Sequence, residues 1–146
     1  MPETLPPATA VVNPKVPGSR YPFSELAGVG VAYRVAEALL RVARQTARPG
    51  DPPLAVGAED FLDLVALGTV ADLVPLVGEN RNLVRAGLER LNATTRPGVR
   101  ALCEAAGISL GQIDSEEIAY GLGPRLNALG RLEDANPAVD LLTTQD

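Results

Sequence analysis

The chain has 146 residues, which is enough for one domain that buries roughly two thirds of the surface its unfolded form exposes. Hydrophobic residues make up 46% and no apolar run is long enough to cross a bilayer, so composition excludes an integral membrane protein and favours a soluble, cytosolic one. The net charge of −5 argues against a free-standing nucleic-acid-binding module, because Lys and Arg supply most non-specific affinity for phosphate.

The first 18 residues are rich in proline and predict an extended segment. Within it, the β-favouring run at residues 9–12 predicts one short strand that joins a sheet. A lone strand cannot pair its backbone groups, so without neighbouring strands this run would be an exposed edge or would fray.

Residues 27–46 predict the first helix, because their apolar side chains recur on one stripe and their charged side chains lie on the other. Gly28 and Gly30 stand at the start of this helix. Glycines there could let the backbone approach a phosphate, but close packing is their more common use and is favoured here.

A loop rich in Pro and Gly at residues 48–53 separates this helix from the next. Residues 58–67 predict the second helix, which carries several large apolar side chains. We expect it to end at Gly68, which leaves residues 69–72 in a turn and brings Asp72 to a helix terminus.

Two further helices are predicted at residues 79–91 and 97–106. Pro97 suits the first helical position and Gly107 suits the position just after the last turn. Cys103 falls inside the second of them, where a small buried side chain is a better interpretation than a reactive thiol.

Asp114 and Glu117 have the spacing of a capping box, and they predict a short helix that runs to Tyr120. A last helix at residues 138–143 follows, with Asn136 as its N-cap. Few aromatic side chains are available to stack on bases, and core packing is favoured for each of Tyr21, Phe23, Tyr33, Phe61 and Tyr120.

One carboxylate interrupts the apolar run ALGTVADLVPL at residues 66–76. Burying a carboxylate among apolar neighbours costs about several kcal/mol of free energy, unless a cation or hydrogen-bond donors compensate its charge. The residue types alone leave two interpretations open: Asp72 accepts backbone N–H groups in the following turn, or it binds a metal ion.

Four motifs accompany this run in a fixed order: NPK at residues 13–15, YPFSELAGVGVA at 21–32, ENR at 79–81 and GPRLNALGRL at 123–132. In order and spacing they resemble the RecJ family of single-stranded-DNA exonucleases, within the DHH phosphoesterase superfamily. The resemblance implies an α/β fold, of which this chain would be a predominantly helical part with one N-terminal strand. Residues 1–18 would be the extended segment and residues 19–146 the C-terminal part of the DHH catalytic domain, without the DHHA1-type domain that follows in the family.

The same resemblance implies a two-metal site that uses Mn²⁺ or Mg²⁺, with Asp72 as a catalytic residue and metal ligand. The family builds that site from several aspartates and histidines, and this chain contains no histidine. The family's Asp-His-His triplet precedes the stretch that matches residues 5–14. We therefore interpret the chain as an internal piece of a longer enzyme, and we expect this piece to be inactive by itself.

The glycine-rich stretch at residues 121–130 predicts an interrupted helix or a tight loop that presents polar groups. Arg125 and Arg131 have fork-shaped donors that suit phosphate oxygens, and Asn127 adds an amide. The resemblance favours a phosphate-binding role for all three. The alternative is that Arg125 is solvated and that Arg131 pairs with nearby acidic residues, Glu133 or Asp134.

The resemblance implies 5′-to-3′ degradation of single-stranded DNA in repair and recombination, with a single-stranded-DNA-binding protein and a helicase as partners. Two alternatives remain. One is a non-catalytic helical scaffold or pseudoenzyme, which the absence of histidine keeps open. The other is a DHH phosphodiesterase of small nucleotides, which is a poorer match around residues 123–131.

Overall fold

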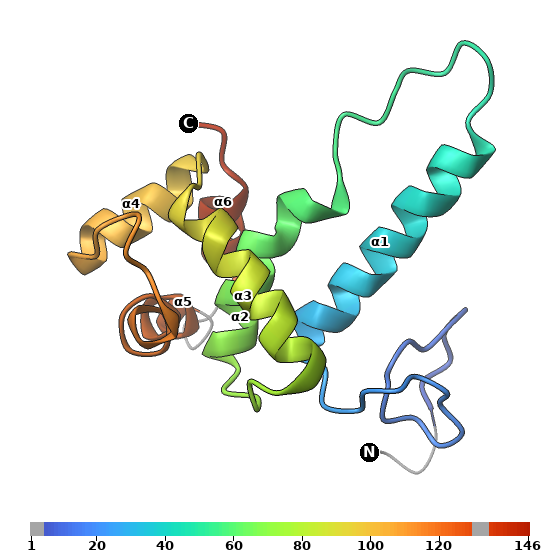
Figure 1. The fold of residues 1–146 in the computed structure, drawn as a ribbon, viewed down its shortest axis with the longest axis horizontal. Coiled ribbons are helices and arrows are strands. Elements are labelled where there is room, and N and C mark those ends of the chain that lie inside the picture. Colours follow the sequence, from blue (N-terminus) through green and yellow to red (C-terminus); the bar gives the residue numbers. More distant parts are fainter. Residues whose placement is uncertain (1–4, 130–134) are drawn as a thin grey trace.

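The computed structural model describes residues 5–129 and 135–146, and its regular elements are helices (Figure 1). In chain order they are α1 (Gly28–Thr46), the 3₁₀ helix η1 (Ala58–Phe61), α2 (Leu62–Ala71), α3 (Gly78–Asn92), α4 (Pro97–Ala106), the π-helix η2 (Glu117–Leu122), α5 (Gly123–Leu129) and α6 (Asn136–Thr143). No helix in the described ranges is long and apolar enough to cross a bilayer.

The predicted helical character is confirmed, but the strand predicted at residues 9–12 is wrong, since the described part of the chain contains no strand. Val11 and Val12 are exposed there. The physical reason is the one that makes a lone strand unstable: no second extended segment in the described ranges pairs with its N–H and C=O groups.

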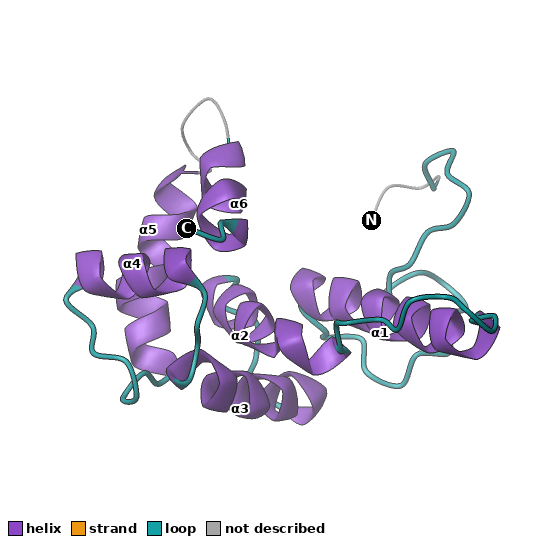
Figure 2. Ribbon diagram, turned by 90° about the horizontal axis from the view of Figure 1, so that it is seen from above, coloured by secondary structure: helices purple, strands orange, loops and turns teal. Residues whose placement is uncertain are grey.

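Helix α2 lies at the centre of the molecule, with α3 alongside it (Figure 1). In the view from above, α4, α5 and α6 gather on one side of α2 and α1 lies on the other (Figure 2). A helix covered on several sides must be apolar all round, and the sequence of α2 provides this. Its buried apolar residues divide between two cores: Ala66, Leu67 and Val70 pack with residues of α3, α4 and η2, whereas Val65 packs with Leu26, Tyr33 and Leu83.

The prediction that the second helix ends at Gly68 is wrong, because α2 continues through Ala71. Gly68 instead permits a close approach of α1: a Cβ atom at this position would lie 2.9 Å from Cγ1 of Val29. The glycine therefore serves packing between helices and does not terminate one. Asp72 still lies at a helix terminus, as predicted, since it is the C-cap residue of α2.

The two glycines at the start of α1 differ in their surroundings. A Cβ atom on Gly30 would lie 2.8 Å from Cδ1 of Leu26, which confirms close packing there. A Cβ atom on Gly28 would have no neighbour within 4 Å, so packing does not explain this glycine.

Helices α3 and α4 confirm the predicted elements to within a residue or so at each end. Pro97 is the first residue of α4, and Gly107 follows it with φ 69°, the left-handed conformation expected of a C-terminal glycine. The last helix begins earlier than predicted, at Asn136 itself. Ala135 occupies the N-cap position, so the prediction that Asn136 is the N-cap is wrong.

The capping box at Asp114 is confirmed. Asp114 Oδ1 accepts the N–H groups of Glu116 at 2.6 Å and Glu117 at 3.3 Å, and Glu117 Oε2 accepts the N–H of Asp114 at 3.0 Å. The helix that follows does not end at Tyr120. It is a π-helix that passes directly into α5. This change of helix type matches the interrupted helix predicted at residues 121–130, as far as residue 129.

Candidate active site around Asp72

Asp72 lines an open hollow of about 530 Å³. The walls come from the start of α1, from α2 and its C-cap, and from α5 and α6. The lining residues are Gly28, Val29, Leu64, Leu67, Gly68, Ala71, Asp72, Leu126, Asn127 and Leu142. Most of these residues are apolar or small, and Asp72 is the one ionisable residue among them.

The backbone of Asp72 closes α2, since its N–H donates to the carbonyl of Gly68 at 3.0 Å. Its side chain is exposed, and within the described residues its carboxylate accepts no hydrogen bond and forms no ion pair. The interpretation that Asp72 accepts backbone N–H groups is therefore not supported there. The C-terminal end of a helix carries partial negative charge, and α2 has no basic residue in its last turn, so a cation would stabilise this carboxylate.

The turn after Asp72 is conformationally strained. Leu73 has φ 55°, the left-handed region that a branched residue rarely adopts, and its side chain is 80% exposed. Such a conformation costs roughly 1–3 kcal/mol and persists only where the surrounding structure holds it. The sequence predicted a turn at residues 69–72, but residues 69–71 are helical and the turn begins at Asp72.

Asn127 reaches the same hollow from α5. Helix α5 can approach the end of α2 because Gly123 has no side chain: a Cβ atom there would lie 3.2 Å from Cβ of Ala71 and 2.9 Å from the carbonyl oxygen of Ile118. The glycine of the GPRLNALGRL motif therefore brings Asn127 and Asp72 to one site, although they are far apart in the sequence.

Of the two arginines predicted to bind phosphate, Arg125 does not line the hollow. Arg125 is exposed, and its Nη1 donates to the carbonyl of Gly121 at 2.7 Å, one helical turn before it. Arg131 lies outside the described residues, as do the acidic residues proposed as its alternative partners. The phosphate-binding roles of both arginines stay predictions.

The donor set of the hollow suits a hard divalent cation. An Asp carboxylate and an Asn carbonyl oxygen are ligands that Mg²⁺ and Mn²⁺ accept. Among the described residues, however, no cluster of three or more His, Cys, Asp or Glu side chains could hold a metal ion. Asp72 and Asn127 therefore suit Mg²⁺ or Mn²⁺ as two members of a larger ligand set.

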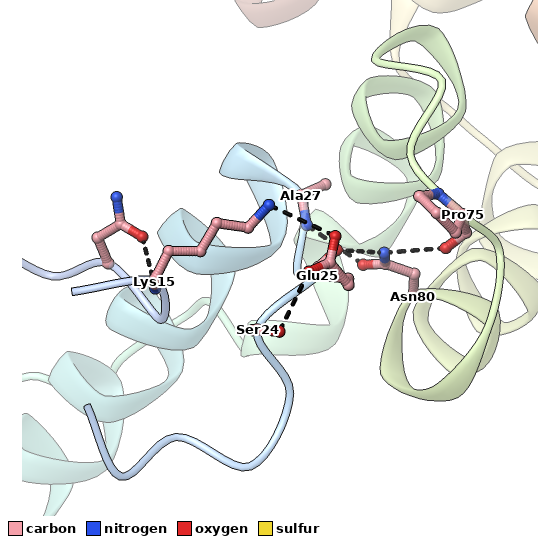
Figure 3. Close-up of polar contacts among 7 residues, drawn as sticks. Lys15, Ser24, Glu25, Ala27, Pro75 and Asn80 are labelled. Carbon is pink, nitrogen blue, oxygen red and sulfur yellow. Dashed lines mark hydrogen bonds and ion pairs between the residues drawn. The ribbon is translucent and has the colours of Figure 1, made fainter. Parts of the chain in front are cut away.

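Asn80 connects the segment before α1 to the turn after Asp72, a role that the sequence did not predict (Figure 3). Its side chain is fully buried. Its Nδ2 donates to the carbonyls of Glu25 at 2.7 Å and Pro75 at 3.1 Å, and its Oδ1 accepts the N–H of Ala27 at 3.2 Å. A buried amide with all these partners fixes local geometry, because each lost bond would leave a buried polar group unpaired.

A charged network lies beside Asn80. Arg34 pairs with Glu37 and Glu79, and the Tyr21 hydroxyl donates to both carboxylate oxygens of Glu79 at 2.8 Å. Burial lowers the pKa of the Arg34 guanidinium, but the hydrogen bonds with Glu37 and Glu79 outweigh it, and the net shift raises this pKa. The Arg34 guanidinium therefore stays charged at all physiological pH values, and its ion pair with Glu79 joins α1 to the start of α3.

The predicted core role of the aromatic residues is only partly correct. Tyr33 is buried, whereas Tyr120 is 83% exposed and Tyr21 is also exposed. The prediction is wrong for Tyr120 because it sits in the π-helix, whose wider turn does not follow the usual helical period. Cys103 is buried and burial raises the pKa of its thiol, which agrees with a structural cysteine.

No model of a known protein family matches the chain. Individual proteins do: it is 48% identical over 142 residues to the single-stranded-DNA-specific exonuclease RecJ of Bacillus subtilis (strain 168). A crystal structure of exonuclease RecJ bound to manganese aligns with all of this chain, at 36% identity and a TM-score of 0.76. A structure of RecJ in complex with Mn²⁺ from Thermus thermophilus aligns with 99% of it, at 35% identity and a TM-score of 0.75.

These matches cover nearly the whole of this chain but a small part of each relative. The chain spans 16% of the Bacillus subtilis protein and 34% and 20% of the two solved chains. The resemblance seen in the sequence motifs is confirmed, and the described helices share the fold of the corresponding segment. The chain belongs to the RecJ family.

Proposed function

We propose that this chain forms part of the active site of a single-stranded-DNA-specific exonuclease, in which Asp72 is a ligand of a divalent cation. The observation that carries the proposal is the Asp72 carboxylate, which lies in a hollow at the negative end of α2 without a hydrogen-bond donor or cationic partner among the described residues. The names of the matched relatives and the Mn²⁺ in two solved structures support the same assignment.

When bound, a pair of divalent ions in such a nuclease lowers the pKa of a water molecule and offsets the charge that develops on the leaving oxygen. Asp72 contributes one carboxylate to hold them. Asn127, which lines the same hollow, can orient the substrate by donating from its amide. Arg125 and Arg131 bind phosphate oxygens of the DNA strand and orient it for removal of nucleotides from the 5′ end.

The cellular role proposed for the parent enzyme is DNA repair and recombination in the cytoplasm, together with a single-stranded-DNA-binding protein and a helicase. It rests on membership of the RecJ family. The relatives favour this function over a non-catalytic scaffold and over a small-nucleotide phosphodiesterase, since each of them is named a single-stranded-DNA-specific exonuclease. The chain alone should not cleave DNA, because its described residues supply too few metal ligands.

A segment exchange tests the proposal. In the chimera, this chain replaces the matching segment of the Bacillus subtilis relative, and Mn²⁺-dependent release of nucleotides from 5′-labelled single-stranded DNA is measured. Changing a hydrogen-bond partner of a metal ligand lowers metal affinity or activity about 10–100-fold. Changing the ligand itself, in Asp72→Asn, should therefore lower the rate by at least about 100-fold. Asp51→Asn is the matched control, because Asp51 lies in the exposed loop after α1 and should leave the rate unchanged.

A chimera that melts cooperatively but does not degrade DNA would contradict the proposed function. An Asp72→Asn chimera as active as its parent would remove Asp72 from the metal site.

A further inference from the structure

We propose that Asn80 is a positioning residue for the Asp72 site, because it fixes the distance between the start of α1 and the turn that follows Asp72. The inference rests on the proposed function, in which Asp72 holds a divalent cation. It concerns a residue that does not line the hollow and whose side chain bonds to Glu25, Ala27 and Pro75, not to Asp72.

The first step is that Asn80 bonds to two segments that adjoin lining residues of the hollow, here called its borders (Figure 3). One is residues 25–27, which precede Gly28, and the other contains Pro75, three positions after Asp72. On one side, its Nδ2 donates to Glu25 and its Oδ1 accepts from Ala27, which is the N-cap residue of α1. Gly28 and Val29, the next two residues, line the hollow. The position of that wall therefore follows from the position of the Asn80 amide.

The second step is that Asn80 holds the turn after Asp72. Its Nδ2 donates to the carbonyl of Pro75 at 3.1 Å. Within the described residues, no other side chain donates to or accepts from residues 73–77. This turn contains the left-handed Leu73, whose conformation would relax without an outside constraint. The core packing of Leu76 also holds this turn, but the bond to Pro75 is the side-chain hydrogen bond that links it to the segment before α1.

The third step is that the amide group itself is needed. A carboxylate at position 80 has the same shape and could still accept from Ala27, but it would face the carbonyl oxygens of Glu25 and Pro75 without a proton to donate. Both carbonyls would lose their donor and meet a negative charge. Asn80→Asp therefore separates the two borders with little change in side-chain volume.

Asn92, at the end of α3, provides a matched control. Its Nδ2 donates to the carbonyls of Leu88 at 3.0 Å and Ile113 at 2.8 Å, and its Oδ1 accepts the N–H of Ile113 at 2.7 Å. It makes the same three kinds of bond as Asn80, but it does not line the hollow and none of its partners borders it. Asn92→Asp should therefore lower stability without altering the Asp72 site.

The test uses four forms of the chimera described above: the parent, Asp72→Asn, Asn80→Asp and Asn92→Asp. Binding of Mn²⁺ is followed from the electron paramagnetic resonance signal of the free ion, which does not depend on turnover, and stability is followed by urea unfolding. We expect both Asn→Asp changes to lower the unfolding midpoint. Asn80→Asp should also weaken Mn²⁺ binding about tenfold, at the lower end of the range for indirect partners of a metal ligand.

Three results would overturn the inference. If Asn80→Asp binds Mn²⁺ as tightly as the parent while Asp72→Asn binds it weakly, Asn80 has no positioning role and the proposed function stands. If Asn92→Asp weakens binding as much as Asn80→Asp, the effect is general loss of stability. If Asp72→Asn binds Mn²⁺ like the parent, the proposed function fails as well. Should Asn80→Asp not fold, Asn80→Ala, which removes the same donors without adding charge, replaces it in the titration.

Discussion

At the scale of single residues, the candidate site depends on contacts that differ widely in how visible they are in the sequence. Asp72 could be singled out because it is the one charge in an apolar run. Asn80 lies in the ENR motif, but its role could not be predicted, because its partners Ala27 and Glu25 lie 53 and 55 positions away and nothing in the local pattern pairs them. Local patterns reveal a residue that is out of place, whereas a residue that joins distant segments becomes apparent only in three dimensions.

The Asp114 capping box gives a prediction about pH. Hydrogen bonding with the Glu117 side chain, and then with the N–H of Glu116, lowers the pKa of Asp114 below its ordinary value of 3.8. A carboxyl group whose pKa is lowered by folding stabilises the fold above its unfolded value, and that contribution disappears as pH falls through the folded value. Asp114→Asn keeps an acceptor but cannot titrate.

We therefore expect the difference in melting temperature between the parent chain and Asp114→Asn to be constant at neutral pH and to shrink below pH 3.8. Thermal melts followed by circular dichroism over this range measure it. A difference that does not change with pH would show that the lowered pKa contributes nothing to stability.

At the scale of elements, a glycine accounts for the error in the predicted end of the second helix. Gly68 has the appearance of a helix terminator in the sequence, yet it lies inside α2 and admits Val29. A glycine can end a helix or allow close packing inside one. The sequence cannot distinguish these two uses in a helix that is apolar on all sides, because no alternation of apolar and polar residues shows whether the helix continues past the glycine. The capping box and Gly107 were predictable because their signals are short and local.

Gly87 lies where α3 packs closely against α2, so a substitution there tests how close the two helices must be. A Cβ atom there would overlap the carbonyl oxygen of Leu62, a backbone atom that cannot rotate away. Gly87→Ala should destabilise the chain by about 1–3 kcal/mol, the usual cost of overpacking. Gly28→Ala is the control, since open space surrounds that position, and it should be neutral or stabilising by up to about 1 kcal/mol. Equal urea midpoints for the two variants would refute the close approach.

The ion pair between Asp63 and Arg96 joins the start of α2 to the loop before α4. Arg96 Nε donates to Asp63 Oδ2 at 2.7 Å, and the Asp63 side chain is only 7% exposed. Arg96→Met would leave that carboxylate buried without its cation, so we expect a loss of about 3 kcal/mol in the free energy of unfolding. The double variant Asp63→Leu with Arg96→Met should recover most of it. A double variant as unstable as the single one would mean that packing, not charge, is responsible.

At the scale of the whole molecule, the chain combines a net charge of −5 with a site that its own described residues do not complete. Both properties agree with a segment that contributes acidic ligands to a larger metal centre, where bound cations offset the negative charge. The helical fold and the family could be predicted from the sequence. The geometry of the hollow could not, because Asp72 and Asn127 meet only through the packing of α5 on α2.

The most direct test of the central claim is a crystal structure of the chimera grown with Mn²⁺, with anomalous diffraction used to locate the ion. We predict a manganese peak at coordination distance, about 2.0–2.6 Å, from a carboxylate oxygen of Asp72. Manganese bound elsewhere in the active site, with the Asp72 carboxylate in contact with water alone, would contradict it.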